Sequence, residues 1–395
     1  MTAKRSGDRT QQTAMMRIAF FGHNVADAAI RRRVAAFEAD GFSVRGFMAR
    51  RGPMIDPGWE TVDLGETRDG AFVHRIRSVF SGADRAAEDP ALADAEVIYA
   101  RNLDMLATAF LAKRKRGLDT PVIYECLDVH RLMVRGDPIG AGLRAIERAL
   151  LKRCKGLVVS SPGFVRNYFE PRHRGHFHAH LIENRLAEGM DYGPRPEPRT
   201  VDPGQPLKLG WVGILRCGRS FKLLCALADA FPSELEIHLH GKPAHNEIEA
   251  FDSHVAQRPN LTYHGPYKAP EDLSGIYDSI DVVWAGDFME AGYNSVWLLP
   301  NRIYEGGYYA TPPIAPAGTE TATWIRAQDT GLLVPEPLES TLAECVSKLI
   351  SDRKPLEDAE RQLLGLPDSV FIQPKGEMAR LMAAIFDDTP VGVPA

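Results

Sequence analysis

Short apolar runs that alternate with helical stretches constrain most strongly how this 395-residue chain can fold. Residues 17–21 read as a buried strand, and Ile30, Val34 and Phe37 then recur on one face of a helix. Residues 43–48 form a second apolar run. A strand, a loop, a helix and another strand in this order are typical of the start of a doubly wound parallel sheet.

The pattern continues along the chain and is interrupted once. Further strands are expected at residues 96–99, 121–124, 156–159, 207–215, 235–239, 260–263 and 280–284. Residues 191–206 hold five prolines, which excludes a helix or a central strand there. We therefore expect a tail at 1–16, a first domain at 17–190, a linker at 191–206, a second domain at 207–370, and a C-terminal helix with a tail at 371–395 that returns to the first domain.

Charge is distributed unevenly between the two halves. Residues 1–200 carry 32 Lys and Arg against 25 Asp and Glu, whereas the remainder carries 15 against 27. Basic clusters at 31–33, 113–116 and 152–155 are suited to anionic lipid headgroups or a lipid pyrophosphate, although they equally suit solvated helix ends. Nucleic acid is disfavoured, because no basic platform with interleaved aromatic residues accompanies the charge.

The cellular compartment is predicted from two features, a hydrophobic leader or span and the spacing of the cysteines. The apolar run after residues 1–14 is too short for a signal peptide or a membrane span, which predicts a cytoplasmic protein. The five cysteines have no metal-ligand spacing, so free thiols are expected. Alternate histidines at 176, 178 and 180, with His173, invite a metal interpretation, but no acidic or cysteine partner has ligand spacing. We predict no metal site.

Polar residues follow several strands at the edge where open α/β sheets bind ligands. In the first half these residues are Gly22, His23, Arg101, Asn102, Asp128 and His130. In the second half, the loop 213–219 lies between a strand and a helix, so its backbone can approach phosphate oxygens while arginine neutralises them.

Residues 297–334 carry a more specific pattern. A helix that contains Glu305 is followed by a strand at 313–315, a helix start at Gly318 and Thr319, and a closing Gly-Leu-Leu-Val. This order resembles the retaining, nucleotide-sugar-dependent glycosyltransferases of the GT-B fold (family four), especially succinoglycan-type exopolysaccharide enzymes. The resemblance covers nearly the whole chain. It implies two Rossmann-like domains that face a central cleft.

The resemblance also implies roles for the donor site. Glu305 matches the second acid of the family's Glu-x7-Glu motif, which holds the donor ribose, whereas Trp297 stands at the first acid. Glu290 is a candidate replacement for that acid, or an ordinary loop residue. The remaining donor-binding candidates are Gly213, Arg216, Arg219, Asn301, Arg302, Gly318 and Thr319.

The same resemblance places Asp128 and His130 beside the transferred sugar, with Glu290 as the third catalytic candidate. Gly22, His23, Arg101 and Asn102 are expected to contact the acceptor. The expected reaction moves a hexose from a nucleotide diphosphate sugar, such as a UDP-sugar, to a lipid-linked or oligosaccharide acceptor, without a cofactor or required metal. The enzyme would act in the cytoplasm or at the inner face of the cytoplasmic membrane.

Two other functions remain open. A nucleotide-sugar-modifying Rossmann enzyme that uses NAD would need Gly-x-Gly-x-x-Gly after the first strand, and residues 21–24 lack that spacing. The other is a non-catalytic sugar-nucleotide-binding subunit of a polysaccharide assembly machine. The one feature that favours it is Trp297, which stands where the family has its first acid.

Overall fold

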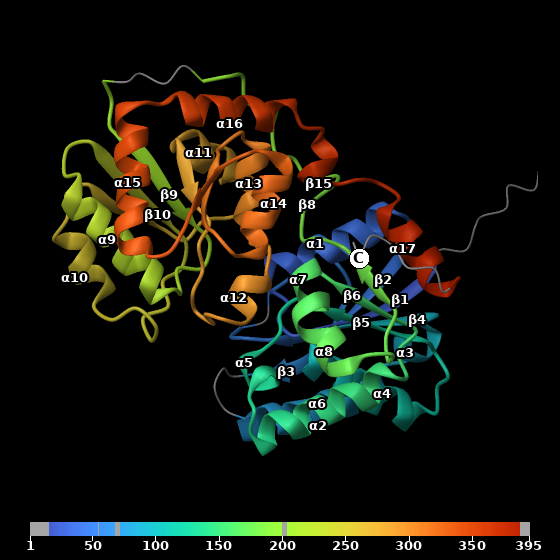
Figure 1. Cartoon of the computed structure of the whole chain (residues 1–395). Helices are drawn as coiled ribbons and strands as arrows, with labels where there is room; N and C mark the ends of the chain where they lie inside the picture. The colour runs from blue at the N-terminus through green and yellow to red at the C-terminus, as the bar shows by residue number, and fades with distance from the viewer. Residues whose placement is uncertain (1–15, 54, 68–71, 200–203, 388–395) are drawn as a thin grey trace, which may run out of the picture.

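Two parallel sheets organise the chain, each covered by helices on both faces (Figure 1). The computed structural model describes residues 16–53, 55–67, 72–199 and 204–387. The first sheet has the order β3-β2-β1-β4-β5-β6-β7, and the second has the order β11-β10-β9-β12-β13-β14. Both orders are those of doubly wound sheets, and the expected fold class of two Rossmann-like domains is confirmed.

The strands of the first sheet are short and almost fully buried in its centre. They are β1 (Arg17–Gly22), β2 (Ser43–Arg50), β3 (Thr61–Glu66), β4 (Val97–Arg101), β5 (Val122–Cys126), β6 (Gly156–Val159) and β7 (Ala179–Leu181). Central strands with apolar residues on both faces are expected when helices cover both sides of a parallel sheet.

Helices cover this sheet in two layers. On one face, an apolar cluster joins the sheet to α2 (Phe72–Glu88), α4 (Leu103–Arg116), α6 (Pro138–Leu151) and α7 (Pro162–Phe164). On the other face, α1 (Ala28–Ala39) packs beside the C-terminal helix α17 (Glu377–Phe386). The short helices α3 (Ala91–Asp94), α5 (Arg131–Val134) and α8 (Glu170–His173), with a π-helical turn at Val165–Phe169, complete this domain.

The second sheet contains β9 (Leu207–Val212), β10 (Leu235–His240), β11 (Leu261–Gly265), β12 (Val282–Trp284), β13 (Pro313–Pro316) and β14 (Leu332–Val334). One face packs against α9 (Gly218–Ala230), α10 (Phe251–Ala256) and α15 (Leu338–Ser351). The other face packs against α11 (Leu273–Asp278), α13 (Asn301–Tyr308), α14 (Glu320–Gln328) and α16 (Lys354–Gly365). The helix α12 (Asn294–Trp297) extends toward the first domain.

The chain passes between the domains at a small two-stranded parallel sheet. It consists of β8 (Leu186–Ala187) and β15 (Ile372–Gln373), which follows a 3₁₀ turn at Asp368–Val370. Both strands lie at the junction of the two domains in Figure 1. The proline-rich segment at 191–199 has no helix or strand and lies on the second domain, where Arg195 and Arg199 donate hydrogen bonds to backbone carbonyls.

Three of our sequence expectations fall partly outside the described residues. These are the tail at 1–16, the end of the linker at 200–203, and the tail at 388–395. Within the described part of the chain, no helix combines the length and apolar character that a membrane span requires.

Candidate active site

A cavity of about 2320 Å³ opens between the carboxyl edges of the two sheets. Loops that follow β1, β4 and β5 supply the first wall, and loops that follow β9, β10 and β12, with the start of α13, supply the opposite wall. Ligands bind at this edge of open α/β sheets, because the loops there converge and the helices begin there. The structure thus brings most of the predicted site residues together.

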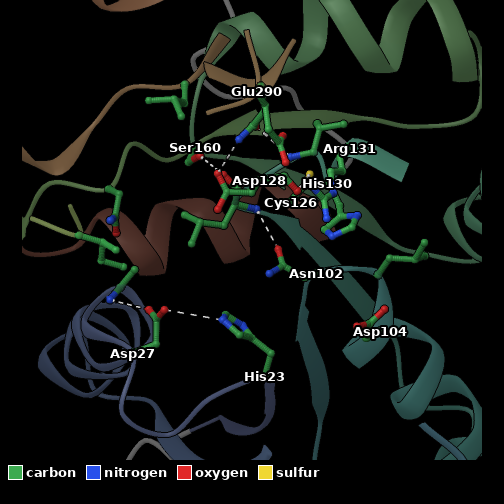
Figure 2. Close-up of a pocket in the computed structure, with 18 of the residues that line it drawn as sticks. His23, Asp27, Asn102, Asp104, Cys126, Asp128, His130, Arg131, Ser160 and Glu290 are labelled. Carbon is green, nitrogen blue, oxygen red and sulfur yellow. Dashed lines mark hydrogen bonds and ion pairs between the residues drawn. The ribbon is translucent and has the colours of Figure 1, made fainter. Parts of the chain in front are cut away.

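Two carboxylates lie near each other in the cavity, Asp128 from the loop after β5 and Glu290 from the loop after β12 (Figure 2). Asn294 of α12 links the walls: its Oδ1 accepts from the Val129 backbone at 3.1 Å, and its Nδ2 donates to Asp128 at 3.3 Å. Burial raises the pKa of Asp128, although the positive charge of Arg216 acts to lower it. Burial, and then the charge of Asp128, raises the pKa of Glu290.

Asp128 is accessible from the cavity, yet protein atoms surround it closely enough to raise its pKa. Ionisation of a carboxyl group in such a place costs more free energy than in open water, because the protein does not solvate the charge fully. Two acids with raised pKa values that face one cavity are a common arrangement at catalytic sites.

His130 and His23 lie on the same wall. His130 precedes α5, and its Nδ1 accepts a hydrogen bond from the Leu132 backbone at 3.3 Å, which fixes the ring orientation. His23 lies 3.6 Å from Asp27, the residue that caps α1. Asn102 also lines the cavity, and its side chain accepts from the Leu127 backbone at 3.4 Å, beside Asp128 (Figure 2).

The opposite wall presents positive charge. Arg216 lines the cavity and lies 3.6 Å from Asp287, while Arg302 is buried and donates to the Trp284 carbonyl at 3.1 Å. Lys242, which the sequence analysis missed, is exposed in the same wall. These three cations surround the loop at Gly213, whose backbone also lines the cavity.

Close contact between two loops shapes this wall. The Gly213 N–H donates to the His240 carbonyl at 3.0 Å, and the Leu215 N–H donates to the Lys242 carbonyl at 3.0 Å. Gly241 has φ +137°, and a Cβ there would overlap the carbonyl oxygen of Gly213. Glycine is therefore required at 241, because the two backbones leave no room for a side chain.

Glu305 lines the cavity but is already engaged. Its carboxylate forms a buried ion pair with Arg32 of α1, in the other domain, and accepts from the Tyr277 hydroxyl at 3.2 Å. Nearby, Asn301 accepts from the Asn184 amide at 2.6 Å. Arg32 was not predicted as a site residue, since an arginine in a run of three on a helix reads as a basic surface cluster.

Arg219 lies outside the cavity, which corrects its predicted place in the donor site. Its guanidinium binds Glu336 and Glu339 and lies 4.8 Å from the Phe288 ring centroid. Arg219 lies in the first turn of α9, and these acidic partners belong to the start of α15 and the residues before it. Arg216, three residues earlier, remains as the cation of this loop.

Arg101 and Gly22 also lie beneath the cavity and not in it. Arg101 is fully buried and makes two hydrogen bonds to Glu125, which Arg33 also binds. A Cβ at Gly22 would meet the Met48 side chain, so this glycine serves packing between β1 and β2. Neither residue is placed to contact an acceptor, and the acceptor role predicted for both is corrected.

Gly318 and Thr319 do not line the cavity either. The Thr319 hydroxyl caps α14 by accepting from the Ala322 backbone at 3.0 Å, as the predicted helix start requires. The next residue, Glu320, binds Arg166 of the first domain. This helix start therefore joins the domains in the structure and lies outside the cavity to which the predicted donor role had assigned it.

Trp297 is turned toward the first domain. Its side chain packs against the apolar cluster of that domain, and its carbonyl accepts from the Ser161 hydroxyl. Gly163 approaches this backbone so closely that a Cβ would collide with the Trp297 carbonyl. The residue that stands at the first motif acid is thus an interdomain contact, and the acids that line the cavity from this region are Asp287 and Glu290.

Comparison with known proteins agrees with this architecture. No family model matches the chain. The chain is similar to sucrose-phosphate synthase from Thermosynechococcus elongatus, with a TM-score of 0.71 at 16% identity over 95% of this chain and 100% of that one. It is also similar to Anabaena HepE in complex with UDP, with a TM-score of 0.67 at 12% identity over 93% and 100%.

Two Rossmann-like domains with a ligand-sized cavity between their carboxyl edges define the class of the GT-B glycosyltransferases, as the resemblance implied. The chain is 40% identical over 328 residues to the succinoglycan biosynthesis protein ExoL of Rhizobium meliloti (strain 1021), covering 81% of each chain. It belongs to the family of that protein.

Proposed function

We propose that this protein transfers a hexose from a nucleotide diphosphate sugar, preferably a UDP-sugar, to a lipid-linked or oligosaccharide acceptor in bacterial exopolysaccharide assembly. The observation that carries the proposal is one cavity in which Arg216, Lys242 and Arg302 of the second domain lie with two carboxylates, Asp128 and Glu290, and the His130 side chain. Family membership supports the pathway, and HepE, a protein of the same fold, binds UDP.

The diphosphate would lie against Gly213, Arg216, Arg302 and Lys242. Fixed cations stabilise the charge that grows on a departing phosphate, and they need no reorganisation during the reaction. Asn301 and Glu305 lie at the adjacent helix start, where a ribose hydroxyl would compete with Arg32 for Glu305. We propose that transfer needs no metal ion, because these cations take its electrostatic role.

The sugar would lie between Asp128, His130 and Glu290. A raised pKa lets one of the two acids hold a proton while the other is ionised, which suits hydrogen bonding to sugar hydroxyls and to charge at the anomeric carbon. Retention of configuration is part of the proposal through the family resemblance. His23 and Asn102 line the same cavity, and we propose that they contact the acceptor.

An apolar extension of the cavity supports a lipid-linked acceptor. It runs between α2, α4 and α6, where Phe80 is 53% exposed and Ile139 and Ile146 are each 51% exposed. Lys113, Arg114 and Arg153 line the same extension. Exposed apolar groups beside cations match the chemistry of an anionic membrane surface, so we propose peripheral association at the inner face of the cytoplasmic membrane.

The test is a titration of the purified protein with a panel of nucleotide sugars, followed by measurement of nucleotide diphosphate release with and without lipid-linked saccharides. We expect slow release from one donor alone and faster release with acceptor. Arg216→Ala should weaken nucleotide binding about tenfold or more, as loss of a charge-assisted hydrogen bond worth about 1.5–3 kcal/mol implies. Arg219→Ala should bind normally, because that side chain faces away from the cavity.

A second candidate is a non-catalytic sugar-nucleotide-binding subunit, favoured by the apolar packing of Trp297 at the first acid position. Tight nucleotide-sugar binding with no release for any acceptor would support it and would contradict the transferase proposal.

A further inference from the structure

Three histidines gather on one face of the second sheet, at its edge and outside the cavity. His238 and His240 alternate along β10 and therefore share a face, opposite the buried Ile237 and Leu239. The pairing register between β10 and β11 shifts between Leu239 and His240 of β10. His264 of β11 is therefore the extra residue of a bulge and lies beside His238 and His240.

The ring nitrogens of these residues lie close together. One nitrogen from each histidine lies within 4.8 Å of the other two. His238 Nδ1 and His264 Nε2 are 2.9 Å apart, and the ring centroids of His240 and His264 are 4.3 Å apart. Ligand nitrogens of a tetrahedral ion with bonds of about 2.0–2.1 Å are separated by little more than 3 Å. The His240 and His264 rings are stacked with an interplanar angle of 2°, so these rings would have to turn for all three nitrogens to face one ion.

A second observation points to a ligand. The Nε2 atom of His240 is buried and has no hydrogen-bond partner among the described residues. A buried ring nitrogen without a partner loses its hydration without compensation. On the outer side, Glu236 lies 3.6 Å from His238 Nε2, while the other nitrogen of that ring faces the cluster. Metal-binding histidines commonly have a carboxylate on the nitrogen that does not bind the ion.

We propose that His238, His240 and His264 form a binding site for a divalent transition metal of the zinc class. Three imidazoles favour Zn²⁺ and its neighbours over Mg²⁺ or Ca²⁺, which prefer oxygen ligands. His264 is exposed, so the fourth position is open to water. A neutral imidazole can bind such an ion directly.

The site would stabilise structure and take no part in the transfer chemistry. None of the three histidines lines the cavity. A bound ion would fasten the edge strand β11 to β10, and the His240 carbonyl accepts from Gly213 at 3.0 Å, in the loop that lines the cationic wall. The proposal is therefore independent of the transferase proposal and would stand if that one failed.

The experiment uses the full-length protein, freed of metal by chelation and then gel-filtered after incubation with ZnCl₂ or MgCl₂. We expect one zinc and no magnesium retained per chain, and a rise in Tm of about 2–4 °C with zinc, as a ligand that binds the folded state produces. His264→Gln, at an exposed position, and the double variant His238→Gln/His264→Gln should lose both effects.

His245→Gln is the matched control, since His245 is exposed in the same domain and outside the cluster. It should retain zinc as the natural protein does. The metal-free Tm of His264→Gln should equal that of the natural protein, which shows that the variant folds. Zinc retained by His264→Gln at full stoichiometry, or no zinc retained by the natural protein, would overturn the proposal.

Discussion

The pair formed by Arg32 and Glu305 shows at the residue scale how a predicted ligand contact can also hold two domains together. Both side chains are buried and lie on helices of different domains. Sequence resemblance identified Glu305 through its motif position. It could not identify Arg32, because no local pattern distinguishes the one arginine of residues 31–33 that meets a carboxylate 273 residues away.

We expect Glu305→Ala to lower the free energy of unfolding by about 3–5 kcal/mol, because it leaves the buried Arg32 charge without a partner. Glu305→Gln should cost less, since its amide oxygen still accepts from the guanidinium. Urea denaturation measures both. Asp84→Ala is the control: its pair with Lys115 is exposed at both side chains, and its loss should cost less than about 1 kcal/mol. Equal losses for Glu305→Ala and Asp84→Ala would contradict the structural assignment.

Asp128 gives a pH-dependent prediction. Burial raises its pKa, so the folded protein binds this proton more tightly than the unfolded chain. The resulting stability is complete below the ordinary carboxyl pKa and is lost as pH rises through the raised value. At neutral pH the ionised group therefore opposes folding. We expect Asp128→Asn to raise Tm at pH 7.5, to have little effect near pH 4, and to impair transfer.

The control for this prediction is Asp137→Asn. The pKa of Asp137 is lowered, chiefly by the hydrogen bond from the Gly140 backbone, so its ionised form favours folding. Its replacement should not raise Tm at pH 7.5. A Tm for Asp128→Asn that is unchanged or lower at that pH would show that Asp128 is not destabilised by its surroundings.

Elements were predictable where a strand is apolar throughout. The strands expected at 17–21 and 156–159 correspond closely to β1 and β6. A central strand that is buried on both faces appears in the sequence as a continuous apolar run, so it can be predicted without knowing its neighbours. The edge strand β3 was missed, since half its residues are polar and it has no continuous apolar run. The histidine cluster was also missed, although alternating histidines at the end of residues 235–240 place two imidazoles on one face.

The contact between the loops that follow β9 and β10 can be tested by substitution of its glycine. Gly241→Ala should disrupt the cationic wall, because its Cβ would occupy the place of the Gly213 carbonyl. We expect a lower Tm and at least tenfold weaker nucleotide binding by calorimetry. Gly265→Ala is the matched control: Gly265 also has positive φ, but open space surrounds its Cβ position. It should cost only about 1–3 kcal/mol of backbone strain and leave nucleotide binding intact.

On the scale of the whole molecule, the fold places the opposite net charges of the two sequence halves on two different domains. The first domain bears the basic residues and the apolar extension of the cavity, whereas the second bears the excess of acids. No sequence pattern indicates that Lys113, Arg153 and Phe80 share one surface, because α2, α4 and α6 meet only in the folded helix layer.

We expect the protein to float with vesicles that contain anionic lipid and to leave them as ionic strength rises, since about 1 kcal/mol per basic residue near the surface is screened by salt. Phe80→Ser should weaken the association at every salt concentration. Equal partition to neutral and anionic vesicles would favour a soluble acceptor.

The paired crossing strands β8 and β15 have a mechanical consequence. Both passages of the chain between the domains lie side by side and pair as strands, so the two connections are joined at one place. We expect any change in the angle between the domains to be centred there and to alter the width of the cavity. Such a change would also have to separate Glu305 from Arg32.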